Sequence, residues 1–575
     1  MPNFIIIFDI LVTVNYLHFM FVRVKTSKNS PKSAIQIVES IRDGKTVKQR
    51  IVRHVGTAYN DKEIDDLKNL AEHIKARMEE ETQPNIFNPD ELADTIIAAR
   101  KKADSEKPLQ VNLRNLREVQ RVITGIHGVF SNIYSEIGLD TIITSRHYAA
   151  RRDLRHIVMA RIANPSSKRQ SVIDLTQNFG VEISLDSVYR MMDTVDEAAI
   201  DKINRCAVET ARSLLKEDVN VAFYDCTTLY FESFAESDEL LKNGYSKDLK
   251  FNQPQIILAL LTTVSGLPIG YKLYPGNTFE GNTLCDAIKT LREEYSVKRI
   301  VFVADSAMLS KDNLTKLEEQ QIEYVVGARL RSLPVIKQDE IFNESGWVNT
   351  YCNEETDELE RCKELQMQND RRLIVTYRSS RAKKDKADRE KTLQKLVGRI
   401  KKSKDPASLI SNFGYRKFIK TTGDATIEID EDKVASICKW DGMHGILSNV
   451  RDLSAAELRA HYKSLWEIEE CFRISKTDLK FRPVFHWTDK RVRAHIAICF
   501  MSLLCVRYLQ YQLKVQGHCY SVQSIIRELN SIQTSVVKDI KTNRKYAIPS
   551  SISEIAHIIF KHCSIKLDQI PYELN

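Results

Sequence analysis

The sequence predicts an α/β protein built on a mixed sheet with helices on its faces, and the order of segments between residues 219 and 331 carries this prediction. Three runs with strand periodicity come first: NVAFYDCTTLYFES, QPQIILALLTTV and LPIGYKLYPG. A helical segment (NTLCDAIKTLREEY), a strand (RIVFVAD), a second helix (KDNLTKLEEQQ) and a last strand (IEYVVGAR) follow. An antiparallel meander joined to parallel crossover units is the order of a ribonuclease H-like fold.

The composition is that of a folded, soluble protein with more than one domain. At 575 residues the chain exceeds the length at which a single core stops growing, so we expect two or three domains. Hydrophobic residues make up 43% and charged residues 28%, and neither Pro nor Gly is frequent enough to predict disorder. The net charge of +8 permits a nucleic-acid partner without requiring one.

The eleven cysteines show neither a C-x-x-C pair nor zinc-finger spacing, which argues against a structural zinc site or a disulfide framework. We therefore expect a reducing compartment. Cys226 directly follows Asp225 and could be a nucleophile, but no positioned His is evident and free Cys is commonly a buried core residue. The sequence favours the structural role for Cys226.

Changes in periodicity and charge divide the chain into segments. Residues 1–19 form an apolar run too short and too polar for a membrane span, so we expect an upstream start or a disordered segment. Next come a small basic region of strands and a helix (20–106), a helical region (107–218), the sheet-forming domain (219–331 and 441–515), a charged insertion (332–440) and a C-terminal helical tail (516–575). The apolar run within KRVRAHIAICFMSLLCVRYLQYQL predicts a buried core helix rather than a membrane span.

Positive charge gathers in two N-terminal places. The predicted strands between residues 20 and 56 alternate apolar and basic residues, which forms either a solvated face or a DNA contact; the basic positions are Arg23, Lys25, Lys48, Arg50 and Arg53. Residues 146–194 are rich in Arg and Lys, and SVIDLTQNFGVEISLDSVYRMMDTV resembles a helix-turn-helix whose second helix opens at Ser184 or Asp186. DNA reading by this pair stands beside the plain alternative of an ordinary helical hairpin.

Two aspartates stand on strands that the fold makes neighbours. Asp225 lies on the first strand of the predicted sheet, and Asp305 ends the strand IVFVAD. An isolated Asp at a strand end is more often a cap or a turn former. The strand order nevertheless predicts that the two carboxylates meet at one edge of the sheet.

A third carboxylate lies on a predicted long helix, AAELRAHYKSLWEIEECFRISKTDL. Tyr462, Glu469 and Lys476 recur every seven residues, which places them along one stripe of a continuous α-helix. Glu467 projects almost opposite to Glu469, and Glu470 lies about 100° around the axis. These two acids are therefore expected to be solvent-exposed or engaged in salt bridges.

At these positions the chain resembles the DDE-class transposases of bacterial insertion sequences, in the group with a Tyr-x2-Arg-x3-Glu-x6-Lys motif. This sequence has Tyr462, Leu465, Glu469 and Lys476 in that pattern. The resemblance extends through most of 219–510, including FYDCTTLYFES, YPGNTFEGNT, VADSAMLSKDNL and FRPVFHWTDKRVRAHI. Leu465 departs from the family's Arg, so one contact to the transposon-end phosphates is in question; Lys463, Arg473 or Arg482 could replace it.

The resemblance implies a metal-dependent site formed by the catalytic residues Asp225, Asp305 and Glu469. Phosphodiester cleavage and transfer build up charge on the entering and leaving oxygens, and two metal ions stabilise both. Three carboxylates plus substrate phosphates suit Mg²⁺, so we expect two Mg²⁺ ions, with Mn²⁺ able to substitute. Asp225 is assigned as the bridging ligand, while Asp305 and Glu469 each complete one shell.

DNA recognition is expected to use other residues. The predicted DNA-binding residues, drawn from the motif and from the basic positions that follow it, are Tyr462, Lys476, Arg473, Lys480, Arg491 and Arg493. Residues 146–194 are expected to select the element's ends. Trp347 and Trp440 are weak candidates for stacking on a flipped base, as in related transposases, since Trp is more often a core residue.

The predicted function is therefore a DNA transposase that binds terminal inverted repeats, cleaves at the element ends and transfers the 3′ ends to target DNA. The expected partners are the double-stranded DNA of these repeats and of the target, without a membrane, and the expected assembly is a dimer in the synaptic complex. It would act in the bacterial cytoplasm, at the nucleoid when bound to DNA. Two alternatives stay open: an impaired or domesticated DNA-binding protein, and a ribonuclease H-like nuclease without strand transfer.

Overall fold

The protein is represented by a computed structural model that describes residues 19–27, 30–43, 46–58, 61–80, 109–216, 221–231, 236–237, 239–244, 253–278, 283, 286, 301–304, 311–353, 358–402, 413–422, 426–566 and 569–574. The chain forms two compact units, residues 1–97 and 98–575, and each is described by itself. Residues 1–18 lie outside the described residues, and so does the predicted helix NTLCDAIKTLREEY except for residues 283 and 286.

The N-terminal unit is an antiparallel sheet packed against one helix. Its strands are β1 (Phe19–Ser27), β2 (Ser30–Asp43) and β3 (Thr46–Ala58), and its helix is α1 (Asp61–Glu80). Alternation along β2 buries Ile35 and Ile37 against apolar side chains of α1. The predicted strands and helix are thus confirmed. On the basic face, Arg50 pairs with Glu39 at 2.8 Å, while Lys25 and Arg53 are exposed.

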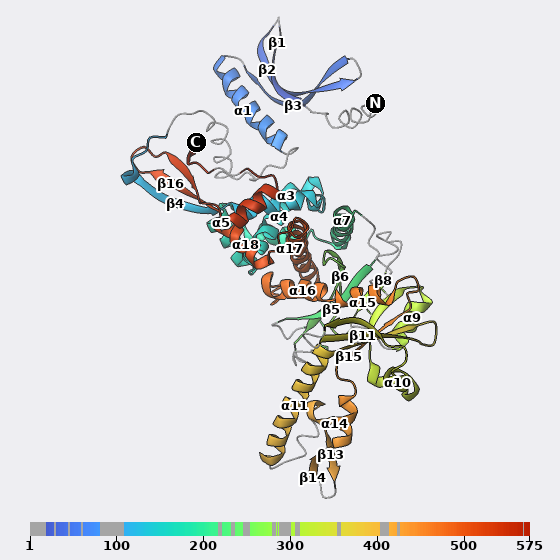
Figure 1. Cartoon of the computed structure of the whole chain (residues 1–575). Coiled ribbons are helices and arrows are strands. Elements are labelled where there is room, and N and C mark those ends of the chain that lie inside the picture. The colour runs from blue at the N-terminus through green and yellow to red at the C-terminus, as the bar shows by residue number, and fades with distance from the viewer. Residues whose placement is uncertain are drawn as a thin grey trace, which may run out of the picture. The chain divides into compact units, whose positions relative to one another are not determined.

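The centre of the second unit is a mixed sheet in which nine strands of the described chain take part (Figure 1). Strands β5 (Val221–Tyr230), β6 (Gln255–Thr263) and β7 (Pro268–Pro275) form an antiparallel meander. Strand β8 (Val301–Ala304) runs parallel to β5, and β9 (Glu323–Ala328) runs parallel to β8 after helix α9 (Lys311–Glu319). The resulting order β7-β6-β5-β8-β9 is that of a ribonuclease H-like fold, which confirms the predicted fold class.

The predicted insertion is only partly a separate subdomain, because its first part adds strands to this sheet. Strands β10 (Val348–Asn353), β11 (Glu358–Gln366) and β12 (Arg372–Arg378) continue the sheet, and β15 (Met443–Ser448) joins β12 to β9. Helix α10 (Val335–Phe342) precedes these strands. Between β12 and β15 the chain leaves the sheet as a charged module of α11 (Ser379–Lys402), α13 (Phe413–Arg416), β13 (Ile419–Thr422), β14 (Thr426–Ile429) and α14 (Glu431–Cys438).

Helices precede the sheet as predicted. They are α3 (Gly125–Glu136), α4 (Tyr148–Ala163), α5 (Lys168–Phe179), α6 (Leu185–Met192) and α7 (Glu197–Leu215). Gly180 ends α5 in the left-handed conformation (φ 67°), and the Ser184 hydroxyl caps α6 by accepting a hydrogen bond from the Ser187 N–H. The predicted helix pair with its glycine turn and its start at Ser184 is confirmed.

The most apolar helix is a core element. Helix α17 (Asp489–Val515) is long and apolar enough to cross a membrane, but 94% of its apolar window is buried inside the protein. It contacts α3, α4, α6, α7 and β7. The prediction of a buried core helix is confirmed.

The C-terminal segment differs from its prediction. The sequence predicts helices throughout 114–218 and a helical tail at 516–575, but the structure contains strand β4 (Leu116–Ile123) in the first segment and β16 (Gln533–Asp539), β17 (Lys545–Pro549) and β18 (Tyr572–Leu574) in the second. These strands form one antiparallel sheet, beside helices α18 (Val522–Ser531) and α19 (Glu554–His562). The prediction was wrong there because β4 finds its pairing partner some 410 residues away.

The junction between α3 and α18 can be tested with a glycine. A Cβ at Gly125 would overlap the backbone oxygen of Leu529, which cannot move without displacing α18. We expect Gly125→Ala to lower the free energy of unfolding by about 1–3 kcal/mol, measured by thermal denaturation. Gly398→Ala in α11 is the matched control, because nothing lies within 4 Å of its Cβ; equal stability of the two variants would contradict the close packing.

Candidate active site

Strand β5 separates a core face from a face that carries Asp225. Tyr224 and Cys226 point into an apolar cluster with residues of α7 and α9. Asp225 points to the opposite face and lies opposite Leu260 of β6, which in turn lies opposite Tyr271 of β7. The Tyr271 ring contacts Phe500 of α17 with centroids 4.7 Å apart, so Asp225 is on the sheet face that α17 covers.

Asp225 stands on β5 next to a buried cysteine. The residue is half-buried, and its Oδ1 accepts a hydrogen bond from the Cys226 N–H at 2.8 Å. Cys226 itself is buried, and its thiol contacts the Tyr224 hydroxyl at 3.3 Å. Its structural role is therefore the one the geometry supports.

Asp305 lies outside the described residues, and the strand before it is described as far as Ala304. Within the parallel pair, Val303 of β8 lies opposite Phe223 of β5. Each of these residues stands two positions before one of the two predicted aspartates. The neighbouring strands on which the predicted pair depends are thus present, while the meeting of the two carboxylates stays a prediction.

The predicted long helix is not continuous. Helix α15 (Ala455–Lys463) ends at Ser464, α16 (Trp466–Arg473) begins after Leu465, and a π-helical turn (Ile474–Asp478) follows. Tyr462, Glu469 and Lys476 therefore lie on three successive pieces, and the prediction that one regular helix aligns them was wrong. A π turn has a wider hydrogen-bond ring than an α-helix, so the seven-residue spacing does not fix a common stripe.

The structure shows the surroundings of each of the three motif residues, Tyr462, Glu469 and Lys476. Helix α16 contacts both β5 and β6, which brings the helix of Glu469 beside the strand of Asp225 (Figure 1). The half-buried Tyr462 packs against His444 with ring centroids 5.0 Å apart, and the Lys476 ammonium lies 5.7 Å from the centre of the Phe472 ring. Leu465, which replaces the family's Arg, is half-buried at the helix break.

The acids next to Glu469 are both engaged. Glu467 is 4% exposed and accepts a hydrogen bond from Arg507 of α17 at 2.9 Å. Glu470 pairs with Arg473 at 2.6 Å and 2.7 Å, and this bonding holds the pKa of the Glu470 carboxyl below its usual value. Glu469 is exposed and makes no ion pair within the described part of the chain. The predicted roles of Glu467 and Glu470 as salt-bridged neighbours are confirmed.

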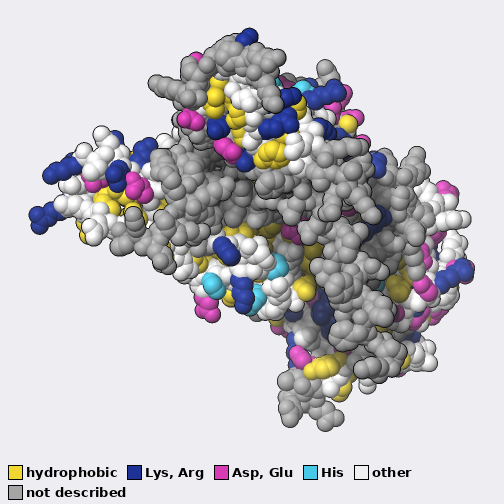
Figure 2. All heavy atoms as spheres, turned by 90° about the horizontal axis from the view of Figure 1, so that it is seen from above, with side chains coloured by type: hydrophobic (Ala, Val, Ile, Leu, Met, Phe, Trp, Pro, Cys, Tyr) yellow, Lys and Arg dark blue, Asp and Glu magenta, His cyan; other side chains and the backbone are white. Residues whose placement is uncertain are grey.

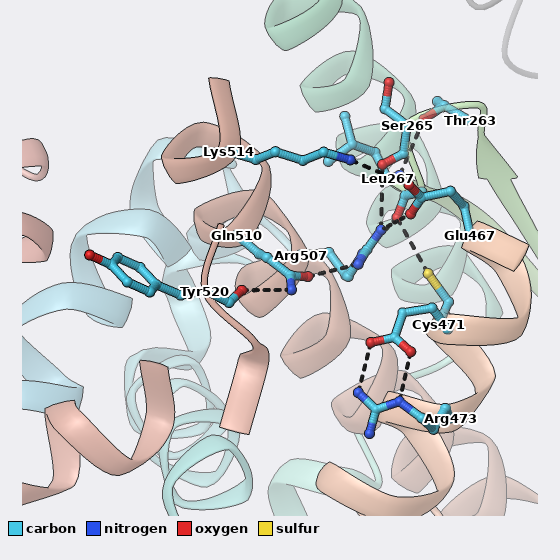
Figure 3. A network of polar contacts seen from close by, with 12 residues as sticks. Thr263, Ser265, Leu267, Glu467, Cys471, Arg473, Arg507, Gln510, Lys514 and Tyr520 are labelled. Carbon is cyan, nitrogen blue, oxygen red and sulfur yellow. Dashed lines mark hydrogen bonds and ion pairs between the residues drawn. The ribbon is translucent and has the colours of Figure 1, made fainter. Parts of the chain in front are cut away.

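Arg507 organises a network that holds α16 on the sheet (Figure 3). Its Nε donates to the Gly266 oxygen at 2.8 Å, and its Nη1 donates to Gln510 at 2.7 Å. Cys471 of α16 donates to the same Gly266 oxygen at 3.3 Å, and burial raises the pKa of its thiol to about 11. We refer to these residues, with Glu467, as the Arg507 network; it joins α16, α17 and the turn between β6 and β7.

Gly266 is required in this turn for two reasons. Its φ of 74° lies in the left-handed region, and a Cβ would collide with the Arg507 guanidinium and the Glu467 carboxylate. Neither Gly266 nor Arg507 was among the functional residues predicted from the sequence. A signal was present in the SG turn between two buried strands and in the single Arg within an otherwise apolar helix segment.

Several predicted DNA-binding arginines already have protein partners. Arg491 makes two 3.0 Å hydrogen bonds to Asp193 and lies over the Tyr189 ring of α6, which ties α17 to the helix pair. Arg493 pairs with Glu239 at 3.3 Å and with Glu197 at 3.7 Å. Lys480, another predicted DNA-binding residue, differs from these arginines: its side chain is exposed and forms no ion pair with described residues.

The two tryptophan candidates are packed against the protein. Trp440 is 7% exposed within an apolar cluster, and the Trp347 indole donates to the Ile341 oxygen at 3.1 Å. By contrast, Phe485 and Trp487, which were not predicted from the sequence as stacking residues, are 56% and 73% exposed on the loop after the π turn. That loop is anchored where Val484 pairs with Phe231 at the end of β5.

No group of three potential metal ligands occurs within the described residues, and Asp305 is not among these residues. The carboxylates that are described, Asp225 and Glu469, offer the hard oxygen ligands that Mg²⁺ prefers. Glu469 makes no ion pair with the described residues.

Two protein families match the chain. The transposase DDE domain matches residues 225–505, and the IS1634 family transposase N-terminal domain matches residues 22–85. Together these matches span more than half of the sequence. The chain belongs to the DDE transposases of insertion sequences, enzymes that cleave and transfer DNA.

Solved structures of other transposases are similar at low sequence identity. A piggyBac transposase synaptic complex with hairpin DNA matches with 12% identity over 70% of this chain and 77% of that chain, at a TM-score of 0.32. A Mos1 transposase paired-end complex matches with 12% identity over 43% of this chain and 70% of that chain, at a TM-score of 0.14. No curated protein matches the sequence.

The Arg507 network gives a stability prediction. Arg507→Leu leaves the buried Glu467 carboxylate with only the exposed Lys514 ammonium, 3.5 Å away, as a cation partner among the described residues. We therefore expect the free energy of unfolding to fall by about 3 kcal/mol, the lower end of the range for a broken buried pair. Replacing both residues, in Arg507→Leu with Glu467→Leu, should recover part of this loss because no charge then remains buried. Denaturant unfolding measures both variants, and a double variant less stable than Arg507→Leu would show that the pair is not the cause.

Proposed function

We propose that this protein binds the terminal inverted repeats of its element, cleaves phosphodiester bonds at the element ends and transfers the 3′ ends to target DNA. The observation that carries the proposal is the match of a transposase DDE domain to residues 225–505, a span that contains all three predicted carboxylates. The strand order β5-β8 and the contact of α16 with β5 support the assignment of these carboxylates to one site.

The assignment of Glu469 as the third acid rests on its neighbours. Glu467 is committed to Arg507 and Glu470 to Arg473, whereas Glu469 is exposed on the same helix. Two Mg²⁺ ions, or Mn²⁺ in their place, would stabilise the charge on the entering and leaving oxygens of the phosphodiester. Asp225, Asp305 and Glu469 would hold these ions. The remaining ligands would be water and DNA phosphates.

The residues of the chain then have separate tasks. Asp225, Asp305 and Glu469 hold the metal-binding oxygens, and the Arg507 network positions the helix of Glu469. Lys476 and Lys480 would contact phosphates, and the helix pair α5–α6 would read base edges. Pairing two element ends implies a dimer in the synaptic complex, acting on DNA in the bacterial cytoplasm.

Carboxylate substitutions test the catalytic assignment. We expect Asp225→Asn, Asp305→Asn and Glu469→Gln each to abolish Mg²⁺-dependent cleavage of a labelled element end while leaving duplex binding nearly unchanged. Glu470→Gln is the matched control, because it alters an adjacent acid that is bound to Arg473. Cleavage that survives Glu469→Gln but is lost in Glu470→Gln would reassign the third acid, and cleavage without strand transfer would favour a simple nuclease.

A lysine substitution tests the phosphate contacts. Lys476→Ala should weaken DNA binding and reduce the slope of log affinity against log salt by about 0.9, the value for one phosphate contact. Lys337→Ala serves as control, since Lys337 already pairs with Glu340 at 2.7 Å. A salt slope that is the same for Lys476→Ala and the wild type would remove Lys476 from the DNA contact.

A further inference from the structure

The sheet formed by β4, β16, β17 and β18, with its turn at residues 540–544, carries more basic than acidic side chains; we call it the basic arm. Its three acids are engaged: Glu118 pairs with Arg121, Glu573 pairs with Arg544, and Asp539 is 5% exposed within the turn. Four cations of the arm make no ion pair with any described residue: Arg117, Lys538, Lys541 and Lys545. The acids of the arm are thus paired or buried, and the positive charge of the unpaired cations is left without a partner among the described residues.

Three of these cations stand in one row across the sheet. Lys538 of β16 lies directly opposite Arg117 of β4 on one side and opposite Lys545 of β17 on the other. Residues directly opposite each other share one face, with neighbouring strands about 4.8 Å apart. Like charges in this arrangement destabilise a sheet, so the row costs the isolated protein stability. An anionic partner would remove this repulsion.

The turn at the end of the arm is held in a definite shape. Asp539 Oδ1 accepts hydrogen bonds from the N–H groups of Lys541 at 2.8 Å and Thr542 at 3.2 Å, and the Asp539 N–H donates to the Arg544 oxygen. These bonds keep the pKa of the Asp539 carboxyl below its usual value. Because the backbone of the turn is already fixed, little backbone entropy is lost when the exposed Lys541 and Arg544 side chains contact a partner.

The arm begins beside the helix pair and extends away from it. Gln120 of β4 donates to the Thr176 oxygen of α5 at 3.1 Å, and β4 contacts α5. Figure 1 shows β4 and β16 projecting from the helices, and Figure 2 shows Lys and Arg side chains at the outer end of this projection. The base of the arm therefore lies next to the helices predicted to read DNA, and the positive row stands farther out along the arm.

We propose that the basic arm grips the phosphate backbone of duplex DNA beside the segment contacted by α5–α6. The inference rests on the proposed function and adds a second DNA-binding surface to it. Duplex DNA carries one negative charge about every 1.7 Å of its axis, so it can neutralise a row of closely spaced cations. Contact to phosphates is independent of sequence and positions the protein along the duplex.

The test measures binding of the full-length protein to a fluorescent, mixed-sequence duplex over a range of salt concentrations. Arg117→Gln with Lys538→Gln and Lys545→Gln should lower affinity and reduce the salt slope by about 2–3, because three phosphate contacts are lost. The control is Lys384→Gln with Lys391→Gln and Lys395→Gln, an equal change of charge on exposed positions of α11. Equal losses in both variants would overturn the proposal, since bulk charge would then explain binding.

Two further readouts separate the possible causes. The melting temperature of the arm variant should equal or exceed that of the wild type, because the repulsive row is gone; a large decrease with lost binding would indicate a structural role instead. Stronger competition by polyglutamate than by duplex DNA at equal charge would overturn the proposal in favour of an acidic protein partner. Because the probe is uncleaved duplex, loss of Mg²⁺-dependent cleavage in Asp225→Asn leaves this measurement unaffected.

Discussion

The buried pair of Glu467 and Arg507 is the interaction on which the candidate active site depends. A charged pair inside a protein is stable only if each group is fully paired, and here backbone oxygens of the β6–β7 turn satisfy the rest of the guanidinium. Gly266 leaves the space in which the pair forms. Because the network joins α16, α17 and the sheet, it determines which acid of α16 is buried and leaves Glu469 exposed.

The ion pairs of the protein single out candidate functional groups, because they show which charged side chains have no partner of opposite charge among the described residues. Around α16, two acids have arginine partners and one does not. On the basic arm, three acids are engaged while a row of cations faces no acid. Folding alone favours neutralised charges, so a charge left uncompensated is a candidate for contact with a partner of the opposite sign; our proposals assign metal ions to the carboxylate site and DNA phosphates to the cations.

The basic residues that the sequence predicts as DNA contacts have different surroundings in the structure. Arg491 links α17 to α6 through Asp193 and Tyr189, so it fixes the helix pair relative to the core. Arg473 is held by Glu470 and Asp478, whereas Lys480 is exposed. The predicted DNA contacts thus include residues that also maintain the fold, and replacing them would alter both binding and stability.

The sequence by itself determined the ribonuclease H-like strand order, the helix pair with its Ser184 cap and the buried character of α17, because these depend on local periodicity and residue type. The candidate carboxylates came from the strand order together with the resemblance to the transposase family. Only the tertiary structure decided that α15 and α16 are separate helices, that Arg507 selects Glu467 for burial, and that residues 116–123 pair with the C-terminal strands. These features arise from contacts between residues far apart in the chain, and local periodicity carries no information about such contacts.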